Sequence, residues 1–207
     1  MSLSIEAKNI TKRYGNRLIL DDINFCLDDE YIYILRGENG CGKSTLLNIL
    51  SSYDQDYEGE VNLNNLSIGY LYQDDLLLKN LSVRDNLKLE EYAQNKKVDQ
   101  EEINTITTKL GIDELLDKKV SDLSGGERKK LSIAQLIIKD KDVIFLDEPT
   151  ANIEKTYAKD LMQYLLDTFK GKIVLIATHD QMPIFNRGIK ELTLKGAKIY
   201  GPVSYTH

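Results

Sequence analysis

Residues 37–45 constrain the fold more than any other segment of the chain. They read Gly-Glu-Asn-Gly-Cys-Gly-Lys-Ser-Thr and fit the pattern G-x-x-x-x-G-K-[ST]. An apolar run at residues 31–35 precedes this loop, and residues 44–50 have the pattern of a helix. A strand, a glycine-rich loop and a helix in this order predict an α/β fold whose first helix begins at the loop.

The same loop predicts a binding site for a triphosphate. Glycines let the backbone approach a crowded anion, and successive N–H groups at a helix N-terminus bind it. We expect Lys43 to reach the β- and γ-phosphates and Ser44 to hold Mg²⁺. A glycine-rich turn can match the pattern by chance, but the strand and helix on either side argue against that alternative.

Length and charge exclude several classes of protein. The chain has 207 residues, enough for one α/β domain. No apolar run approaches the roughly 20 residues that span a bilayer, and the first residues lack the pattern of a signal peptide. The net charge of −6, without a long basic run, argues against nucleic acid as a partner.

The two cysteines, Cys26 and Cys41, indicate a reducing compartment. Cys41 lies inside the glycine-rich loop, where a disulfide would tie down the ligand site, so we expect a cytoplasmic protein with free thiols. Two interpretations of Cys41 stay open. Its thiol is either reactive and shielded by bound nucleotide, or inert and packed behind the loop.

The order of strand and helix patterns predicts a mixed α/β core that is interrupted by a helical segment. Residues 76 to about 140 read as helices, and strand patterns lie on both sides. We expect a single domain, with a core and β subdomain over residues 1–72 and 140–207 and a helical subdomain over residues 74–139. The expected strands cover residues 5–10, 18–25, 31–35, 59–61, 68–71, 143–146 and 173–177, with a hairpin over 192–200.

Three helix starts can be predicted from capping residues. Ser82 and Asp85 form a capping box for a helix that runs to about Ala93, and Asp99 caps the next helix. Ser124 precedes a third helix. The expected apolar side of that helix is Leu131, Ile133, Ala134, Ile137 and Ile138, and that of the following helix is Ala158, Leu161, Met162, Leu165 and Phe169.

An acidic pair follows the apolar strand at residues 142–146. Asp147 and Glu148 should lie at the carboxyl edge of the sheet, beside the phosphate-binding loop. Asp147 suits the coordination shell of Mg²⁺, and Glu148 suits the polarisation of an attacking water. The alternative is a charged pair that merely ends a strand.

Several further motifs, taken in their order along the chain, resemble the ATP-binding subunit of the ABC ATPases. The resemblance runs from about residue 3 to residue 200. Tyr14 matches the aromatic residue that stacks on adenine, and Gln73 matches the glutamine that senses Mg²⁺ and the γ-phosphate. The remaining matches are the signature Leu-Ser-Gly-Gly-Glu at 123–127, the acidic motif at 143–150, the D-loop at 151–154 and the switch histidine within Thr-His-Asp at 178–180.

This resemblance implies a P-loop NTPase core with a mixed sheet, a small antiparallel β subdomain and a helical signature subdomain. It implies that the protein is a Mg²⁺-dependent ATPase with ATP and Mg²⁺ as ligands. The implied catalytic residues are Glu148, His179, Gln73 and Lys43, and the implied Mg²⁺ ligands are Ser44, Gln73 and Asp147. The implied contacts to ATP are Tyr14, Gly37, Asn39, Gly40, Cys41, Gly42, Lys43, Ser44, Thr45, Ser124, Gly125 and Gly126.

In this family the signature helix faces the γ-phosphate that a second subunit holds. The resemblance therefore implies an ATP-sandwiched dimer, either a homodimer or a heterodimer, that powers separate membrane permease subunits. We then expect a cytoplasmic protein, bound to the inner face of the cell membrane when assembled. A soluble ABC ATPase without a membrane partner, as in iron–sulfur cluster assembly, is the alternative. A regulatory protein with little hydrolysis is a third, against which Glu148, Gln73 and His179 argue.

Two features depart from the usual family pattern. Glu154 stands at the end of the D-loop, where the family usually has aspartate. Only 29 residues separate Lys43 from Gln73, so we expect a trimmed antiparallel β subdomain. Asn152 resembles the D-loop of ATPases that serve lipoprotein-release, macrolide-efflux and peptide-export transporters.

Overall fold

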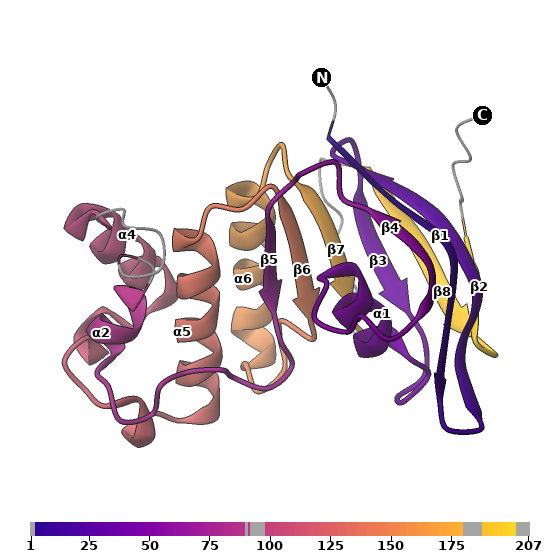
Figure 1. Ribbon diagram of the computed structural model, residues 1–207. Coiled ribbons are helices and arrows are strands. Elements are labelled where there is room, and N and C mark those ends of the chain that lie inside the picture. Colours follow the sequence, from indigo (N-terminus) through magenta and orange to yellow (C-terminus); the bar gives the residue numbers. More distant parts are fainter. Residues whose placement is uncertain (1–2, 90, 92–97, 180–187, 202–207) are drawn as a thin grey trace. The chain divides into compact units, whose positions relative to one another are not determined.

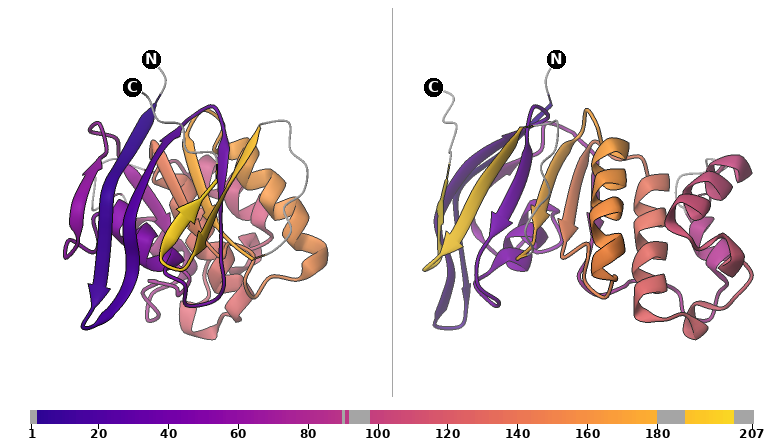
Figure 2. Two further views of the ribbon diagram at one scale, coloured as in Figure 1. Left: turned by 90° about the vertical axis from the view of Figure 1, so that its right-hand side faces the viewer. Right: turned by 180° about the vertical axis from the view of Figure 1, so that it is seen from behind.

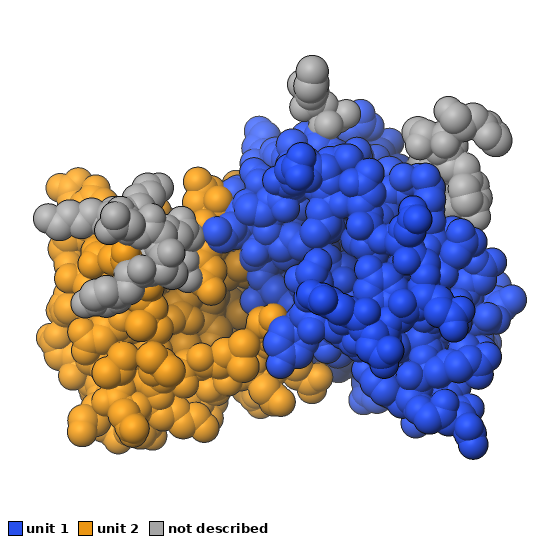
Figure 3. All heavy atoms as spheres, in the orientation of Figure 1, with its two compact units in different colours: residues 1–70, 141–148, 169–207 blue, residues 71–140, 149–168 orange. Residues whose placement is uncertain are grey.

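The computed structural model describes residues 3–89, 91, 98–179 and 188–201. The chain divides into two compact units (Figure 3). Unit 1 comprises residues 1–70, 141–148 and 169–207, and unit 2 comprises residues 71–140 and 149–168. These units are defined by packing, and the expected helical subdomain over residues 74–139 stays a prediction.

Unit 1 contains a small antiparallel sheet with the strand order β2-β1-β4. Its strands are β1 (Ser4–Tyr14), β2 (Arg17–Asp28) and β4 (Glu58–Asn62). An irregularity in β1 changes which side chains face the core. Ile5 and Ala7 are buried before it, and Ile10 and Lys12 are buried after it, because the register shifts around Asn9, whose φ is 52°.

The larger sheet has six strands in the order β5-β6-β7-β3-β8-β9. The pairs β6–β7, β7–β3 and β3–β8 are parallel, and β8–β9 is antiparallel. Every residue of β6 and β7 is buried, as expected for apolar strands covered on both faces. The strands are β3 (Ile32–Arg36), β5 (Ile68–Leu71), β6 (Val143–Asp147), β7 (Ile173–Ala177), β8 (Ile189–Lys195) and β9 (Lys198–Tyr200).

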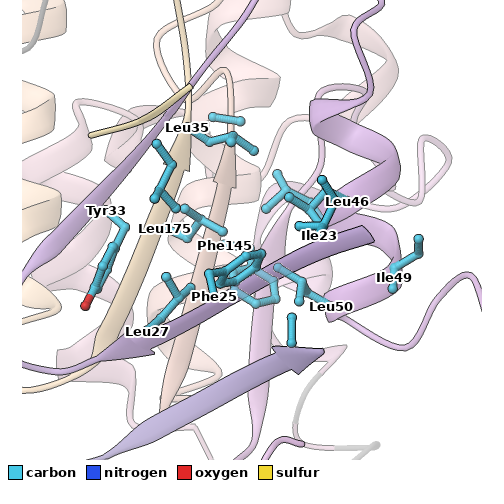
Figure 4. Packing of buried hydrophobic residues seen from close by; sticks show 14 of the residues in the cluster. Ile23, Phe25, Leu27, Tyr33, Leu35, Leu46, Ile49, Leu50, Phe145 and Leu175 are labelled. Carbon is cyan, nitrogen blue, oxygen red and sulfur yellow. The ribbon is translucent and has the colours of Figure 1, made fainter. Parts of the chain in front are cut away.

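Helix α1 (Lys43–Leu50) packs into the core of unit 1. Figure 4 shows side chains of α1, including Leu46 and Leu50, near Phe25 of β2 and Phe145 of β6. The antiparallel sheet, the larger sheet and α1 therefore contribute to one apolar cluster. Because α1 begins at the glycine-rich loop, this packing fixes the loop against the sheet.

Unit 2 is mainly helical (Figures 1 and 2). Helices α2 and α4 pack against α5, and Lys130 of α5 lies over the ring of Tyr157 in α6, 4.4 Å from its centroid. The elements are α2 (Val83–Leu87), α4 (Gln100–Leu110), α5 (Gly125–Ile138) and α6 (Lys155–Thr168), with 3₁₀ turns at Asp113–Leu115 and Val120–Asp122. In the described ranges, no helix has the length and apolar character needed to cross a membrane.

The predicted α/β class, with a mixed sheet and a small antiparallel sheet, is confirmed. The caps at Ser82, Asp99 and Ser124 are confirmed too, because each side chain accepts a hydrogen bond from the following turn. Helix α2 ends at Leu87, whereas the predicted helix ran to Ala93, and residues 90 and 92–97 lie outside the described residues. Two predicted apolar stripes were incomplete: Leu136 and Leu166 are also buried, while Ile137 and Ala158 are half-buried.

Candidate functional site

The glycine-rich loop joins β3 to α1 in unit 1. Lys43 is buried, and its Nζ donates to the carbonyl oxygens of Gly37 at 2.9 Å and Glu38 at 3.3 Å. Gly42, the residue before α1, has a φ of 113°, and a Cβ there would lie 2.9 Å from Cγ2 of Ile19. Only glycine therefore fits at this position without strain. The loop holds an ammonium group inside a curve of backbone, an arrangement suited to phosphate oxygens.

The other predicted loop residues differ in exposure. Asn39 and Gly40 are exposed, and Ser44 and Thr45 are half-buried in the first turn of α1. Cys41 is half-buried and packs against the core of unit 1. This packing supports the interpretation of Cys41 as a space-filling residue behind the loop.

Three adjacent parallel strands end beside one another in unit 1. The sheet order places β7 between β6 and β3, and the residue pairs run in parallel register, with Asp147 opposite Ala177. The glycine-rich loop follows β3, Thr178 and His179 follow β7, and Glu148 follows β6. The fold thus brings the loop, the acidic pair and the histidine to one edge of the sheet.

Glu148 is held on three sides. Its backbone N–H donates to the carbonyl of Ala177 at 2.9 Å, and the Thr178 hydroxyl donates to its Oε2 at 3.2 Å. Its Oε1 lies 2.9 Å from Nδ1 of His179, so an ionised Glu148 requires the proton of that ring on Nδ1. In the sequence, Thr178 is only the residue before the switch histidine. The contact of Thr178 with Glu148 is seen in the structure.

The residues at this edge suit a divalent cation that is held mostly by a substrate. Asp147 is buried and offers a carboxylate. Among the described residues, no group of three or more histidine, cysteine or acidic side chains could by itself hold a metal ion. Mg²⁺ in nucleotide sites is bound by one or two protein oxygens together with phosphate oxygens. Ser44 and Asp147 fit that pattern within unit 1, and Gln73 belongs to unit 2.

Tyr14 lies at the end of β1 with 53% of its surface exposed. Its hydroxyl donates to Oδ2 of Asp54 at 3.3 Å, and Nζ of Lys12 lies 4.9 Å from the centroid of its ring. Sequence reasoning missed both neighbours. The burial of Lys12 follows from the irregularity at Asn9, which puts Lys12 on the same side of β1 as Ile10.

In unit 2, Ser124 caps α5 through a complete capping box. The Ser124 hydroxyl accepts from the N–H of Glu127 at 3.3 Å, and the Ser124 N–H donates to Oε2 of Glu127 at 2.7 Å. Hydrogen bonds from Ser124 to the Glu127 carboxylate, first of all from the Ser124 N–H, lower the pKa of Glu127. A Cβ on Gly126 would lie 2.8 Å from the carbonyl oxygen of Asn152, so this glycine allows the D-loop to approach α5 closely.

Gln73 has an exposed side chain, but its backbone is fixed from α5. Buried Lys129 donates from Nζ to the carbonyls of Tyr72 at 2.9 Å and Gln73 at 3.2 Å. Arg128 donates to the carboxylate of Asp75 at 2.9 Å and to the carbonyl of Leu123 at 2.6 Å. The sequence did not predict these contacts. The position of Lys129, two residues before buried Leu131, is only a weak sequence signal for such contacts.

The structure therefore gathers the predicted residues into two groups. Unit 1 holds Tyr14, the loop at 37–45, Asp147, Glu148 and His179. Unit 2 holds Gln73, the signature at 123–127 and the D-loop at 151–154. Asp180, part of the predicted switch motif, lies outside the described residues.

Comparisons with known proteins agree with the motifs. The family model described as "ABC transporter" matches residues 20–151. The ABC transporter ATP-binding protein YxdL of Bacillus subtilis is 32% identical over 205 residues, which cover 87% of this chain and 79% of that protein. The bacitracin export ATP-binding protein BceA of Halalkalibacterium halodurans is 31% identical over 201 residues, which cover 85% of this chain and 79% of that protein.

Other relatives are longer than this chain. The xylose/arabinose import ATP-binding protein XacJ of Haloferax volcanii is 30% identical over 193 residues, and the match covers 86% of this chain but only 50% of XacJ. The chain thus spans about half the length of that relative. A solved structure, the ADP conformation of the ATP-binding cassette MJ1267 of an ABC transporter, aligns with a TM-score of 0.78 and 25% identity. It covers 97% of this chain and 90% of that chain.

The predicted family, fold and general function class are therefore confirmed. The family match and the relatives both indicate that this chain is an ATP-binding cassette, the kind of domain that acts as the ATPase of transporters. With the glycine-rich loop, the acidic pair and the signature motif in the family's order, the chain belongs to the ABC transporter family.

Proposed function

We propose that this protein binds and hydrolyses ATP with Mg²⁺ and powers separate membrane permease subunits through an ATP-sandwiched dimer. The observation that carries the proposal is the meeting of the glycine-rich loop, Glu148 and His179 at the ends of three adjacent strands in unit 1. Attack of water on the γ-phosphate needs a base for the water and a cation for the phosphate. We assign the base to Glu148 and the cation to Lys43.

Each residue then has a role in binding or hydrolysis. Tyr14 stacks on adenine, and Lys43 with the N–H groups of the loop binds the β- and γ-phosphates. Ser44 and Asp147 would hold Mg²⁺, which would supply positive charge against the phosphate oxygens when bound. The loop contacts also include Gly37, Asn39, Gly40, Cys41, Gly42 and Thr45.

Glu148 acts as the general base and His179 positions it. A base must point at the water that it polarises, and the contacts with Thr178 and His179 restrict the carboxylate to one orientation. His179 is exposed over 66% of its side chain, so a substrate can approach its ring. This accessibility supports its role as the switch histidine.

The signature residues Ser124, Gly125 and Gly126 bind the γ-phosphate that a second subunit holds. Support comes from the capped start of α5, where backbone N–H groups and the helix dipole favour an anion. A homodimer has two such composite sites. The import and export relatives support a role with membrane permease partners. A location at the inner face of the membrane is part of the same proposal.

The decisive experiment is Glu148→Gln. It keeps the size of the side chain and removes the charge that polarises water, so ATP binding should persist while turnover falls by about 10²–10⁴-fold. With ATP and Mg²⁺ the variant should elute as a dimer from a sizing column. Turnover close to wild type would show that Glu148 is not the base.

Permease partners are tested by affinity purification of the tagged protein from solubilised membranes. Co-purification of a membrane subunit supports the transporter assignment. A protein that stays in the soluble fraction, without a membrane subunit, would favour the soluble ABC ATPase instead.

A further inference from the structure

An ion-pair cluster around the buried Lys12 lies beside Tyr14 in unit 1 and takes no part in the proposed chemistry. Lys12 has 2% of its side chain exposed. Its Nζ donates to both carboxylate oxygens of Asp54, at 3.0 and 2.9 Å, and lies 3.3 Å from Oδ2 of Asp56. It also donates to the backbone carbonyl of Asp56.

The cluster joins two distant parts of the sequence. Lys12 and Tyr14 belong to β1, whereas Asp54 and Asp56 lie between α1 and β4. Asp54 contacts both β1 residues: it accepts from Lys12 and, at 3.3 Å, from the hydroxyl of Tyr14. The N–H of Asp56 donates to Asp54 at 3.0 Å and fixes that carboxylate further.

The Tyr14 side chain is thereby held at two points. Its hydroxyl is bound by Asp54, and Lys12 lies against its ring at 4.9 Å from the centroid. An exposed tyrosine without such contacts would sample several rotamers, and binding a base would carry the entropic cost of selecting one. Lys12 approaches the ring from a buried position, which leaves the exposed surface of Tyr14 for a ligand.

Charge keeps this cluster intact at neutral pH. Burial by itself lowers the pKa of Lys12, but hydrogen bonds and charges from Asp54 and Asp56 outweigh it and raise that pKa above its usual value. Burial raises the pKa of Asp54, and the bonds from Lys12 and the N–H of Asp56 outweigh that effect and lower it. Both partners are thus ionised over the physiological range.

We propose that Lys12 is a positioning residue for nucleotide binding, which orders the ring of Tyr14 through Asp54 so that Tyr14 is ready to stack on the base. This inference rests on the proposed role of Tyr14 in adenine binding. It predicts that the cluster contributes to the affinity for the base and leaves the affinity for the phosphates unchanged.

The test compares two ligands, ATP and inorganic tripolyphosphate, by calorimetric titration of the full chain. Lys12→Met should raise the Kd for ATP roughly two- to ten-fold, the usual cost of ordering a side chain on binding, with no change for tripolyphosphate. KM for ATP should rise by a similar factor while kcat stays unchanged. Asp56→Asn is the matched control, because Asp56 pairs with Lys12 and is 98% exposed, and the change keeps Asp54, which binds the Tyr14 hydroxyl.

A double-mutant cycle separates positioning from general distortion. In a Tyr14→Ala background, Lys12→Met should have no further effect on ATP affinity. An equal loss for ATP and tripolyphosphate, or a loss that persists without Tyr14, would overturn the inference. Asp54→Ala, at a more exposed position, should reproduce the ATP-selective loss if Lys12→Met does not fold, and an unchanged ATP affinity in that variant would also overturn it.

Failure of the inference can be told from failure of the proposed function. If Tyr14→Ala weakens ATP binding but Lys12→Met does not, then Tyr14 stacks on the base without help from Lys12. If Tyr14→Ala itself leaves ATP affinity unchanged, the proposed role of Tyr14 is wrong, and the inference about Lys12 falls with it.

Discussion

The two units hold their functional residues by different means. In unit 1 the glycine-rich loop, Glu148 and His179 follow parallel strands, so that many backbone hydrogen bonds of the sheet fix their positions. In unit 2 Gln73 and Ser124 depend on side chains: Lys129 holds the backbone at Gln73, and Glu127 completes the cap of Ser124. A sheet edge distributes its support over many bonds, whereas unit 2 concentrates it in a few.

The largest contrast should appear in nucleotide binding. Lys43→Ala removes a buried cation from the phosphate-binding loop of unit 1, and charged hydrogen bonds contribute about 1.5–3 kcal/mol. We therefore expect the Kd for ATP to rise on the order of 10–100-fold in calorimetric titration. Lys195→Ala, in an exposed part of β8, is the control and should bind ATP as the wild type does. If Lys43→Ala binds ATP with wild-type affinity, the glycine-rich loop is not part of the nucleotide site.

The corresponding change in unit 2 is Ser124→Arg, and it should spare binding. A bulky cation at the start of α5 would block the surface that we propose meets a second subunit, while the loop of unit 1 is untouched. ATP affinity of the monomer should stay within about two-fold of wild type, and ATP should no longer produce a dimer of the Glu148→Gln protein on a sizing column. If Ser124→Arg loses ATP binding as completely as Lys43→Ala, the signature does not act across a dimer.

A smaller effect should separate the two kinds of support directly. Lys129→Met leaves the carbonyls of Tyr72 and Gln73 without this donor, and a buried polar group left unpaired costs about 1–3 kcal/mol. Thr178→Val removes one hydroxyl from the sheet edge of unit 1, where Glu148 keeps its bonds to Ala177 and His179. Urea unfolding should therefore show the greater loss in Lys129→Met. Exposed Lys109→Met is the control, and equal losses in the first two variants would contradict the comparison.

The smallest expected effect is a pH dependence at the cap of α5. The pKa of Glu127 is lowered in the folded protein by hydrogen bonds to Ser124, so its charge adds stability above the ordinary carboxyl pKa of 4.5. This contribution is lost as the pH falls through the lowered value. Glu127→Gln should lower the free energy of unfolding by about 0.3–1 kcal/mol at pH 7. This difference between variant and wild type should disappear in strong acid. A stability difference that stays constant with pH would show that the charge of Glu127 does not stabilise the cap of α5.

The sequence was informative wherever a local pattern determines structure. The glycine-rich loop, the fully apolar strands β6 and β7 and the cap at Ser124 could be predicted because neighbouring residues define them. The contacts of Lys12 with Asp54 could not, because the partners lie 42 residues apart and meet only after β1 changes register at Asn9. No local pattern marks a shift of that kind.

The same distinction applies to the candidate site. The residues to which we assign chemical roles came from motifs, whereas the residues that support them were missed. Lys129 lies in α5 between Arg128 and Lys130, and its position before Leu131 is only a weak signal that it binds the backbone at Gln73, 56 residues away. Supporting contacts depend on tertiary packing, which sequence patterns along one helix do not contain.

The backbone of Glu148 has a consequence for how this protein can change over generations. Its φ of 46° is a conformation that glycine or asparagine adopts at lower cost than glutamate. Replacement by glycine would relieve that strain and at the same time abolish the proposed base. A population selected only for abundance would therefore drift toward inactive proteins at this position. With Glu148 as the proposed base, glutamate at position 148 serves turnover at the expense of backbone stability.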